Sequence, residues 1–160
     1  MLNWNFFFLG FVVLFVSSCG FKPIYKADNS NYHQLQNIEI ESINSIEGAE
    51  FYNQLKNILP HQHDAQYQLV TTLSFSENYN IIQNKADVFS EIVTVYVNFK
   101  LLDKTTDQVL LNSSFSKPSS YNTTFSPYSN LIQKHDILKN LSIMVAEEIR
   151  NRIIIYFSNN

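Results

Sequence analysis

Strict alternation of apolar and polar residues is the feature that most limits how this chain can fold. Residues 66–76 alternate in this way, with Val70 as the one exception. Residues 88–101 alternate again, with Glu91 as the one charged residue on an otherwise apolar face. A sustained period of two predicts strands that bury one face and leave the other wet. We therefore expect a sheet that is packed on one side.

Two shorter runs complete the predicted sheet. Ile38-Glu39-Ile40-Glu41 alternates, which predicts a short strand near 35–42. Residues 103–107 are typical of a hairpin connection, and Val109, Leu111 and Phe115 alternate on the strand that follows. The Asn-rich segment 77–87 and the segment 117–130 have no such period, and we expect loops there.

A first helix is predicted between the first two strands. Asn44 and Glu47 have the spacing of a capping box, and Pro60 should end the helix. The predicted buried stripe at helical spacing consists of Ile46, Ala49, Tyr52, Leu55 and Leu59.

A longer helix is predicted after the last strand. Ser126-Pro127 supplies a hydroxyl cap followed by proline at the first helical position. We expect Ile153-Ile154-Ile155-Tyr156-Phe157 to form the last turns. The predicted inner stripe consists of Leu131, Leu138, Leu141, Val145 and Ile149, with Ile137 and Met144 beside it.

The order of elements is β-α-β-β-β-α, which indicates an α+β fold. A helix between the first two strands predicts a right-handed crossover and a parallel pair, whereas the last three strands should form an antiparallel meander. We expect a two-layer sandwich, in which both helices cover one face of a four-stranded, mostly antiparallel sheet.

The N-terminal region carries a separate signal. An unbroken apolar run from Phe6 to Val16 precedes Ser17, Ser18 and Cys19. The run is shorter than the roughly 20 residues that span a bilayer. Small residues directly before the cleavage site, here Ser17 and Ser18 before Cys19, are typical of a lipoprotein signal peptide. We predict a signal peptide over 1–18, a lipidated N-terminus and tether over 19–34, and one folded domain over 35–160.

Cys19 is the only cysteine in the chain. Free cysteine often serves as a small buried hydrophobe. In an exported chain, however, a lone thiol cannot pair within the chain and is open to oxidation. Acylation at Cys19 removes that problem, and several acyl chains together anchor a protein stably to a membrane. We therefore predict lipidation of Cys19.

Composition excludes several functional classes. Eleven Lys and Arg against fourteen Asp and Glu give a net charge of 11 − 14 = −3, which does not suit nucleic-acid binding. With three glycines in all, the chain has no Gly-rich phosphate loop and no nucleophile elbow. His61 and His63 are too few for a metal site. We expect no enzymatic activity, no cofactor and no metal.

Several segments resemble one known family. Cys19-Gly20-Phe21-Lys22-Pro23-Ile24-Tyr25 is similar to the start of the alphaproteobacterial form of the LPS-assembly lipoprotein LptE family. Segments 46–55, 96–103 and 120–149 resemble its first helix, central strand, and last loop and helix. The resemblance implies a non-enzymatic outer-membrane lipoprotein that faces the periplasm. It implies a plug and assembly partner of the LptD β-barrel, which helps deliver lipopolysaccharide to the outer leaflet.

Candidate contact residues follow from the predicted sheet. Lipopolysaccharide carries phosphates, so Lys85 and Lys117, near strand connections, are candidate ligand-binding residues, with solvated turn charges as the alternative. Val88, Ile92 and Tyr96 form an apolar row on the wet face. They are candidate partner contacts, with ordinary strand propensity as the alternative.

A different class of function also fits the sequence. A lipid-anchored periplasmic ligand-binding protein or envelope scaffold would have the same leader and the same sandwich. The two hypotheses differ in whether a large barrel protein accompanies the chain through purification.

Overall fold

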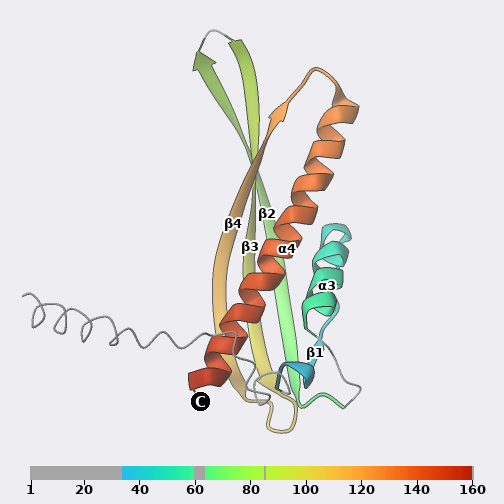
Figure 1. The fold of residues 1–160 in the computed structure, drawn as a ribbon, viewed down its shortest axis with the longest axis vertical. Coiled ribbons are helices and arrows are strands. Elements are labelled where there is room, and N and C mark those ends of the chain that lie inside the picture. Colours follow the sequence, from blue (N-terminus) through green and yellow to red (C-terminus); the bar gives the residue numbers. More distant parts are fainter. Residues whose placement is uncertain (1–33, 60–63, 85, 160) are drawn as a thin grey trace, which may run out of the picture.

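The computed structural model describes residues 34–59, 64–84 and 86–159 (Figure 1). In chain order the elements are β1 (Ile38–Ile40), α3 (Ile46–Ile58), β2 (Tyr67–Asn84), β3 (Ala86–Asp103), β4 (Val109–Thr123) and α4 (Pro127–Asn159).

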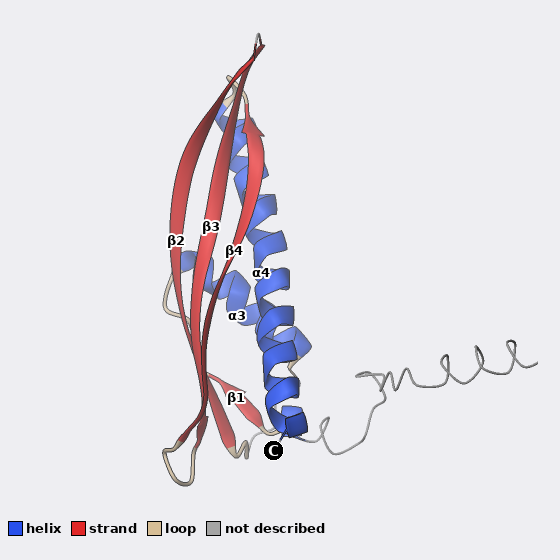
Figure 2. Cartoon of the chain, turned by 90° about the vertical axis from the view of Figure 1, so that its left-hand side faces the viewer, coloured by secondary structure: helices blue, strands red, loops and turns tan. Residues whose placement is uncertain are grey.

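The four strands form one sheet in the order β1-β2-β3-β4. β1 pairs with β2 in parallel, with Ile38 opposite Tyr67, while the β2–β3 and β3–β4 pairs are antiparallel. Both helices lie on the same side of this sheet (Figure 2). The predicted two-layer α+β sandwich is confirmed.

The core lies between β3 and α4. On the helix-facing side of β3, alternate residues from Val93 to Leu101 are at most 1% exposed, which confirms the alternation. Leu141 and Ile149 of α4 and Phe51 of α3 meet them in the same cluster. Each such side chain contributes about 1.5–3 kcal/mol when it leaves water, so this cluster holds the two layers together.

The start of α3 differs from the prediction. Ser45, not Asn44, is the N-cap, and its Oγ accepts a hydrogen bond from the backbone N–H of Gly48 at 2.8 Å. A Cβ added at Gly48 would lie 2.4 Å from Cγ2 of Ile43. The helix therefore turns a residue without a side chain toward the segment that leads into it.

The prediction of which residues of α3 are buried was also partly wrong. Leu55 and Leu59 are buried as predicted, but Ile46 and Ala49 are exposed. Phe51 takes their place and packs edge-to-face on Phe75 of β2, with ring centroids 5.7 Å apart. The large aromatic side chain faces the sheet, because it removes more apolar surface from water than alanine does.

The loop predicted over 77–87 is instead the end of a long hairpin. β2 continues to Asn84 and β3 begins at Ala86, with Glu77 opposite Val93 and Tyr79 opposite Glu91. Backbone pairing with β3 satisfies the N–H and C=O groups of this segment. That pairing outweighs the low strand propensity of its asparagines.

β4 likewise extends beyond its predicted end and includes Pro118 opposite Thr94. Proline lacks an N–H and is tolerated in edge strands, where the missing donor can face solvent. β4 is an edge strand of the described sheet. The Ser- and Pro-rich composition that indicated a loop is therefore compatible with this position.

The hairpin connection over 103–107 is confirmed. The Asp103 carboxylate accepts hydrogen bonds from the backbone N–H groups of Thr105 at 2.8 Å and Thr106 at 3.2 Å. These bonds, that from Thr105 above all, hold the pKa of Asp103 below its ordinary value. Asp107 takes the left-handed conformation, with φ of 55°, which aspartate tolerates better than most residues.

α4 begins and ends as predicted. The Ser126 Oγ accepts a hydrogen bond from the N–H of Ser129 at 3.4 Å, and residues 153–157 are helical. Leu131, however, is 65% exposed rather than buried, because the first turns of α4 lie where the helix and the sheet diverge (Figure 1). Met144, predicted beside the inner stripe, is 43% exposed, so that part of the prediction is also wrong. None of the helices among the described residues is long and apolar enough to cross a membrane.

Candidate functional site

One side of the sheet has no helix over it (Figure 2). We call its central part the bare face and define it by four rows of residues paired across β2, β3 and β4. The rows are Thr72-Asn98-Ser114, Ser74-Tyr96-Ser116, Ser76-Thr94-Pro118 and Asn78-Ile92-Ser120. All of these side chains are exposed or half-buried, and none is charged.

Two of the three predicted partner contacts lie on the bare face. Tyr96 is 47% exposed between Ser74 and Ser116, and Ile92 is half-buried between Asn78 and Ser120. The side chain of Val88 lies outside the described part of the chain. The bare face thus consists of uncharged side chains, mostly with hydroxyl and amide groups, and has Tyr96 and Ile92 on its middle strand, β3.

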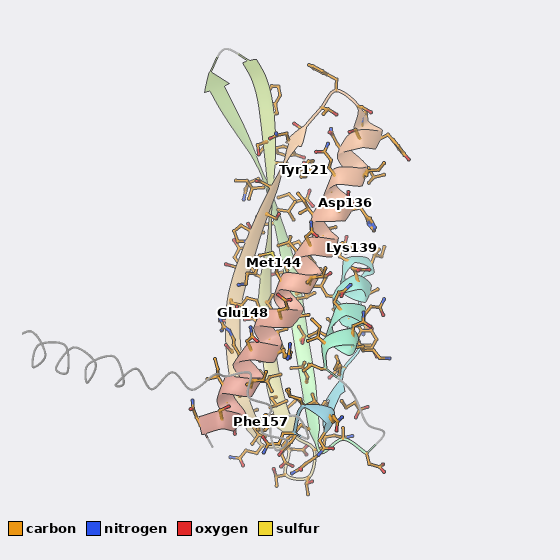
Figure 3. All side chains as sticks on the ribbon, viewed as in Figure 1. Tyr121, Asp136, Lys139, Met144, Glu148 and Phe157 are labelled. Atoms are coloured by element: carbon orange, nitrogen blue, oxygen red, sulfur yellow. The ribbon has the colours of Figure 1, made fainter. Side chains whose placement is uncertain are left out.

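A second surface lies on the opposite side of the sheet, between the long hairpin and the first turns of α4. A cavity of about 520 Å³ opens there. Tyr79, Glu91 and Tyr121 are directly paired across three strands and line it. Glu77 of β2 and Lys134 of α4 are the other charged residues of its lining. Figure 3 shows Tyr121 at the level where β4 and α4 begin to separate.

Two polar contacts organise this cavity. The Tyr121 hydroxyl donates a hydrogen bond to Oε2 of Glu91 at 2.5 Å, and Glu91 is only 4% exposed. The Lys134 ammonium donates to Oε1 of Glu77 at 2.6 Å. A buried carboxylate requires such partners, because desolvation of an unpaired charge is costly.

The pKa shifts follow from these contacts. The hydrogen bond from Lys134 is the main cause that lowers the pKa of Glu77, and the same bond raises the pKa of Lys134. Burial is the largest cause that raises the pKa of Tyr121, and its bond to Glu91 adds to that effect. The tyrosine is therefore a neutral hydrogen-bond donor throughout the physiological pH range.

Exposed apolar side chains lie in and beside this cavity. Three of the eleven exposed large apolar residues in the described chain line it, and Phe125 and Tyr128 directly follow the lining residues Thr124 and Pro127. We call this set the apolar rim: Tyr79, Phe89, Phe125, Tyr128 and Leu131. A concentration of apolar side chains at a cavity that also holds charged groups is a feature of binding surfaces.

Lys117 does not lie at a strand connection. It is within β4, opposite Val95, and pairs with Glu148 of α4 at 3.1 Å. Arg152 also binds Glu148, at 2.8 Å, and donates to the Ser113 hydroxyl at 2.6 Å. The prediction placed Lys117 in a loop because segment 117–130 has no alternation of apolar and polar residues. In the structure, the ion pair of Lys117 with Glu148 links β4 to α4, near the Glu148 label in Figure 3.

The remaining predicted residues lie outside the described part of the chain. These are Cys19, Lys85, His61 and His63. In the residues that are described, no group of three or more His, Cys, Asp or Glu side chains is placed to hold a metal ion.

Glu91 was the one sign of the cavity that could be seen in the sequence. It was the only charged residue on the apolar face of its strand. Glu77, Tyr79 and Tyr121 fell in segments predicted as loops, so their pairing across the sheet could not be foreseen. Lys134 is one helical lysine among several, and only the packing of α4 brings it to Glu77.

Three crystal structures share this fold. A candidate lipoprotein from Caulobacter crescentus CB15 superposes with a TM-score of 0.68 at 16% identity, covering 82% of this chain and 98% of that one. A minor lipoprotein from Acinetobacter baumannii has a TM-score of 0.53 at 14% identity, covering 74% and 90%. The rare lipoprotein B from Shewanella oneidensis has a TM-score of 0.58 at 12% identity, covering 76% and 95%. At these identities the likeness concerns the fold.

At the level of sequence, no family model matches the chain. A protein of Rickettsia prowazekii (strain Madrid E), named uncharacterized protein RP188, is 35% identical over 153 residues. The match covers 96% of this chain and 98% of the relative, so it includes the strands and helices of both surfaces. The chain therefore belongs to the same family as the Rickettsia prowazekii protein RP188.

Proposed function

We propose that this protein is a lipid-anchored envelope protein that plugs an outer-membrane β-barrel of the LptD type. In this role its bare face rests against the inner wall of the barrel and assists barrel assembly. The protein then takes part in the delivery of lipopolysaccharide to the outer leaflet, without enzymatic activity of its own. The observation that carries the proposal is the uncharged bare face, with Tyr96 and Ile92 on its middle strand.

The chemistry of the bare face suits a barrel lumen. A surface in contact with water alone ordinarily has charged residues at about 25–35% of its positions, whereas the bare face has none among its four rows, and Lys100 in the adjoining row is the first charged residue next to them on β3. The interior of an outer-membrane barrel is polar, so hydroxyl and amide groups can exchange hydrogen bonds with it. A partner that covers this face also explains why no helix is needed there.

The N-terminal leader supports an anchored protein. The predicted lipid on Cys19 is separated from the first described residue, Gln34, by a segment that spans at most about 50 Å when extended. That reach lets the sandwich stand in a barrel while the acyl chains stay in the surrounding membrane. The lipoproteins of three bacteria that share the fold are consistent with such an anchor.

The two lysines proposed for lipopolysaccharide now differ in suitability. Lys117 is already bound to Glu148, so a phosphate would have to displace that carboxylate. Lys85 is the better candidate of the two. Replacing Lys85 by Glu should weaken recovery of lipopolysaccharide in a pull-down, whereas replacing Lys117 should act mainly on stability.

Site-specific photo-crosslinking tests the proposal. The full-length protein, tagged at its C-terminus, would carry a photoreactive residue at Tyr96 or, as the control, at Met144 on the exposed side of α4. We expect Tyr96 to crosslink to a large outer-membrane barrel that also co-purifies, and Met144 to give little product. Mass spectrometry of the same preparation should find the leader removed and Cys19 acylated.

The same experiment distinguishes the barrel-plug function from the alternative function. A periplasmic ligand-binding protein or scaffold would purify without a barrel, and Tyr96 would crosslink no more than Met144. That result would contradict the proposal. The cavity between the hairpin and α4 is the observation that favours this alternative.

A further inference from the structure

We propose that the cavity between the long hairpin and α4 binds the guanidinium group of an arginine from a partner protein, while the apolar rim contacts the residues beside that arginine. This interaction site is distinct from the bare face and lies on the opposite side of the sheet. The inference does not depend on the barrel proposed above, because any protein with a suitable arginine could occupy the cavity.

The charge of the cavity selects a cation. Its charged lining residues are Glu77, Glu91 and Lys134, so with both carboxylates ionised the net charge is 1 − 2 = −1. Lys134 is bound to Glu77, while Glu91 accepts from the neutral Tyr121 hydroxyl and also shares a side-chain hydrogen bond with Glu77. One ammonium therefore serves two neighbouring carboxylates, of which Glu91 is 96% buried, and a cationic ligand would supply a second positive charge to this pair.

The shape of the lining favours guanidinium over ammonium. Aromatic rings of Tyr79, Phe89 and Tyr121 line the cavity together with the carboxylates. A planar guanidinium can bind a carboxylate through two hydrogen bonds and stack on an aromatic ring at the same time. An ammonium is more strongly hydrated and lacks the planar fork, so it gains less from such a lining.

The apolar rim indicates that the cation belongs to a polypeptide. Phe125 on the β4–α4 connection is 98% exposed, and Tyr128 and Leu131 at the start of α4 are 73% and 65% exposed. A free small cation would leave these side chains in water. An arginine flanked by apolar residues would cover them while its head enters the cavity, which is the arrangement of an interface hot spot.

Two matched peptides provide the test. Both are short, capped and fluorescently labelled, with the sequence Ser-Leu-X-Leu-Ser. In one peptide X is arginine, and in the other X is citrulline, which has nearly the same shape without the charge. Their binding to the full mature lipoprotein in detergent would be followed by fluorescence anisotropy. We expect the arginine peptide to bind at least tenfold more tightly than the citrulline peptide.

Variants locate the binding in the cavity. Glu91→Gln should weaken the arginine peptide about tenfold. Lys134→Gln should strengthen binding of the arginine peptide several-fold, because the substitution removes the cation that is paired with Glu77 in the free protein. The control Glu147→Gln changes an exposed carboxylate of α4 outside the cavity and should have no effect. If Glu91→Gln impairs folding, as seen by circular dichroism, Tyr79→Ser at an exposed ring should weaken binding instead.

Several results would overturn the inference. Equal binding of the two peptides, or weaker binding after Lys134→Gln, would contradict it. Glycerophosphoethanolamine provides a further check, since its ammonium stands for a lipid head group. If this compound binds in a Glu91-dependent manner and the arginine peptide does not, the cavity takes a lipid ammonium and the proposed protein partner is wrong.

Discussion

The helix-facing side of the sheet has a closed half and an open half. In the closed half, β3 presents Val93, Val97 and Leu101 to α4, and these side chains are almost completely buried. In the open half the same strand presents Glu91 and the exposed Phe89, and the facing residues are Lys134 and Leu131. The same two elements therefore pack tightly over one stretch and separate over the next, where an open cavity with charged and aromatic lining lies between them.

The difference shows which residues allow a second layer to close. Alternating Val and Phe leave no polar group to satisfy, so the helix can lie directly on them. A carboxylate at Glu91 needs a hydrogen-bond donor, and Tyr121 provides it within the sheet. We infer that the closed half supplies stability and the open half supplies binding, and the following measurements test that division.

The largest expected effect is a loss of core packing in the closed half. Phe99 is 1% exposed and lies with its ring centroid 6.4 Å from that of Phe115. Phe99→Ala should lower the free energy of unfolding by about 3–5 kcal/mol, measured by urea denaturation. Phe125→Ala in the open half, where the ring is exposed, is the matched control and should change it by less than about 0.5 kcal/mol. Similar losses for the two variants would remove the distinction between the halves.

A smaller effect is expected for the polar pair inside the cavity. Tyr121→Phe removes the hydroxyl that donates to the buried Glu91 carboxylate, and it should cost about 1–3 kcal/mol because that carboxylate loses its donor. Adding Glu91→Leu to this variant should restore most of the stability, as measured by the same denaturation. If the double variant is no more stable than Tyr121→Phe alone, the Tyr121–Glu91 pair stabilises the fold. The assignment of stability to the closed half alone would then be wrong.

Acid sensitivity should differ between the halves. In the closed half, hydrogen bonds from Arg152 and then Lys117 hold the pKa of Glu148 below its ordinary value of 4.5. A carboxyl with a lowered folded-state pKa stabilises the protein above its unfolded pKa, and this stabilisation is lost as pH falls through the folded value. Glu148→Gln should therefore cost about 1 kcal/mol at pH 7, and the cost should shrink below about pH 4.5.

The matched variant in the open half is Glu77→Gln. The hydrogen bond from Lys134 also lowers the pKa of Glu77, but solvent screens this more exposed pair. Its effect at pH 7 should therefore be smaller than that of Glu148→Gln, with the same sign of pH dependence. Equal effects at the two positions would mean that the open half is as closed to water as the core.

Much of the fold could be predicted from local periodicity. The alternation around Leu69 and Val97 predicted strands with one buried face, and the spacing of Leu141, Val145 and Ile149 predicted a helix that lies on them. In each of these segments the spacing of apolar residues is visible within a few neighbouring positions. The type of element and its buried face can therefore be predicted without knowing which element packs against it.

The binding surfaces depend on pairing between distant residues. The segment after Glu77 becomes a strand because β3 pairs with it, and Pro118 is accepted because β4 lies at an edge. Neither the pairing with β3 nor the edge position of β4 can be inferred from the residues next to these positions in the sequence. Glu91 was visible as a misfit, but its contact with Tyr121 joins residues 30 positions apart, so the cavity could not be predicted.

The smallest stability effect is expected on the bare face, and it extends the comparison to the other side of the sheet. Tyr96→Ser changes a half-exposed ring between two serines, so it should alter the free energy of unfolding by less than about 0.5 kcal/mol. It should nevertheless lower the amount of barrel protein recovered with the tagged chain, because interface tyrosines often contribute much of the binding energy. The control Tyr128→Ser, on the apolar rim, should leave that recovery unchanged.

The two readouts together decide what the bare face is for. A stable Tyr96→Ser variant that recovers less barrel would mean that this surface binds a partner and contributes little to the fold. A variant that loses stability as well would indicate that Tyr96 supports the sheet, and the lower recovery would then follow from unfolding. A stable variant with full recovery would show that the barrel contact lies elsewhere, and the absence of charge on the bare face would need another physical cause.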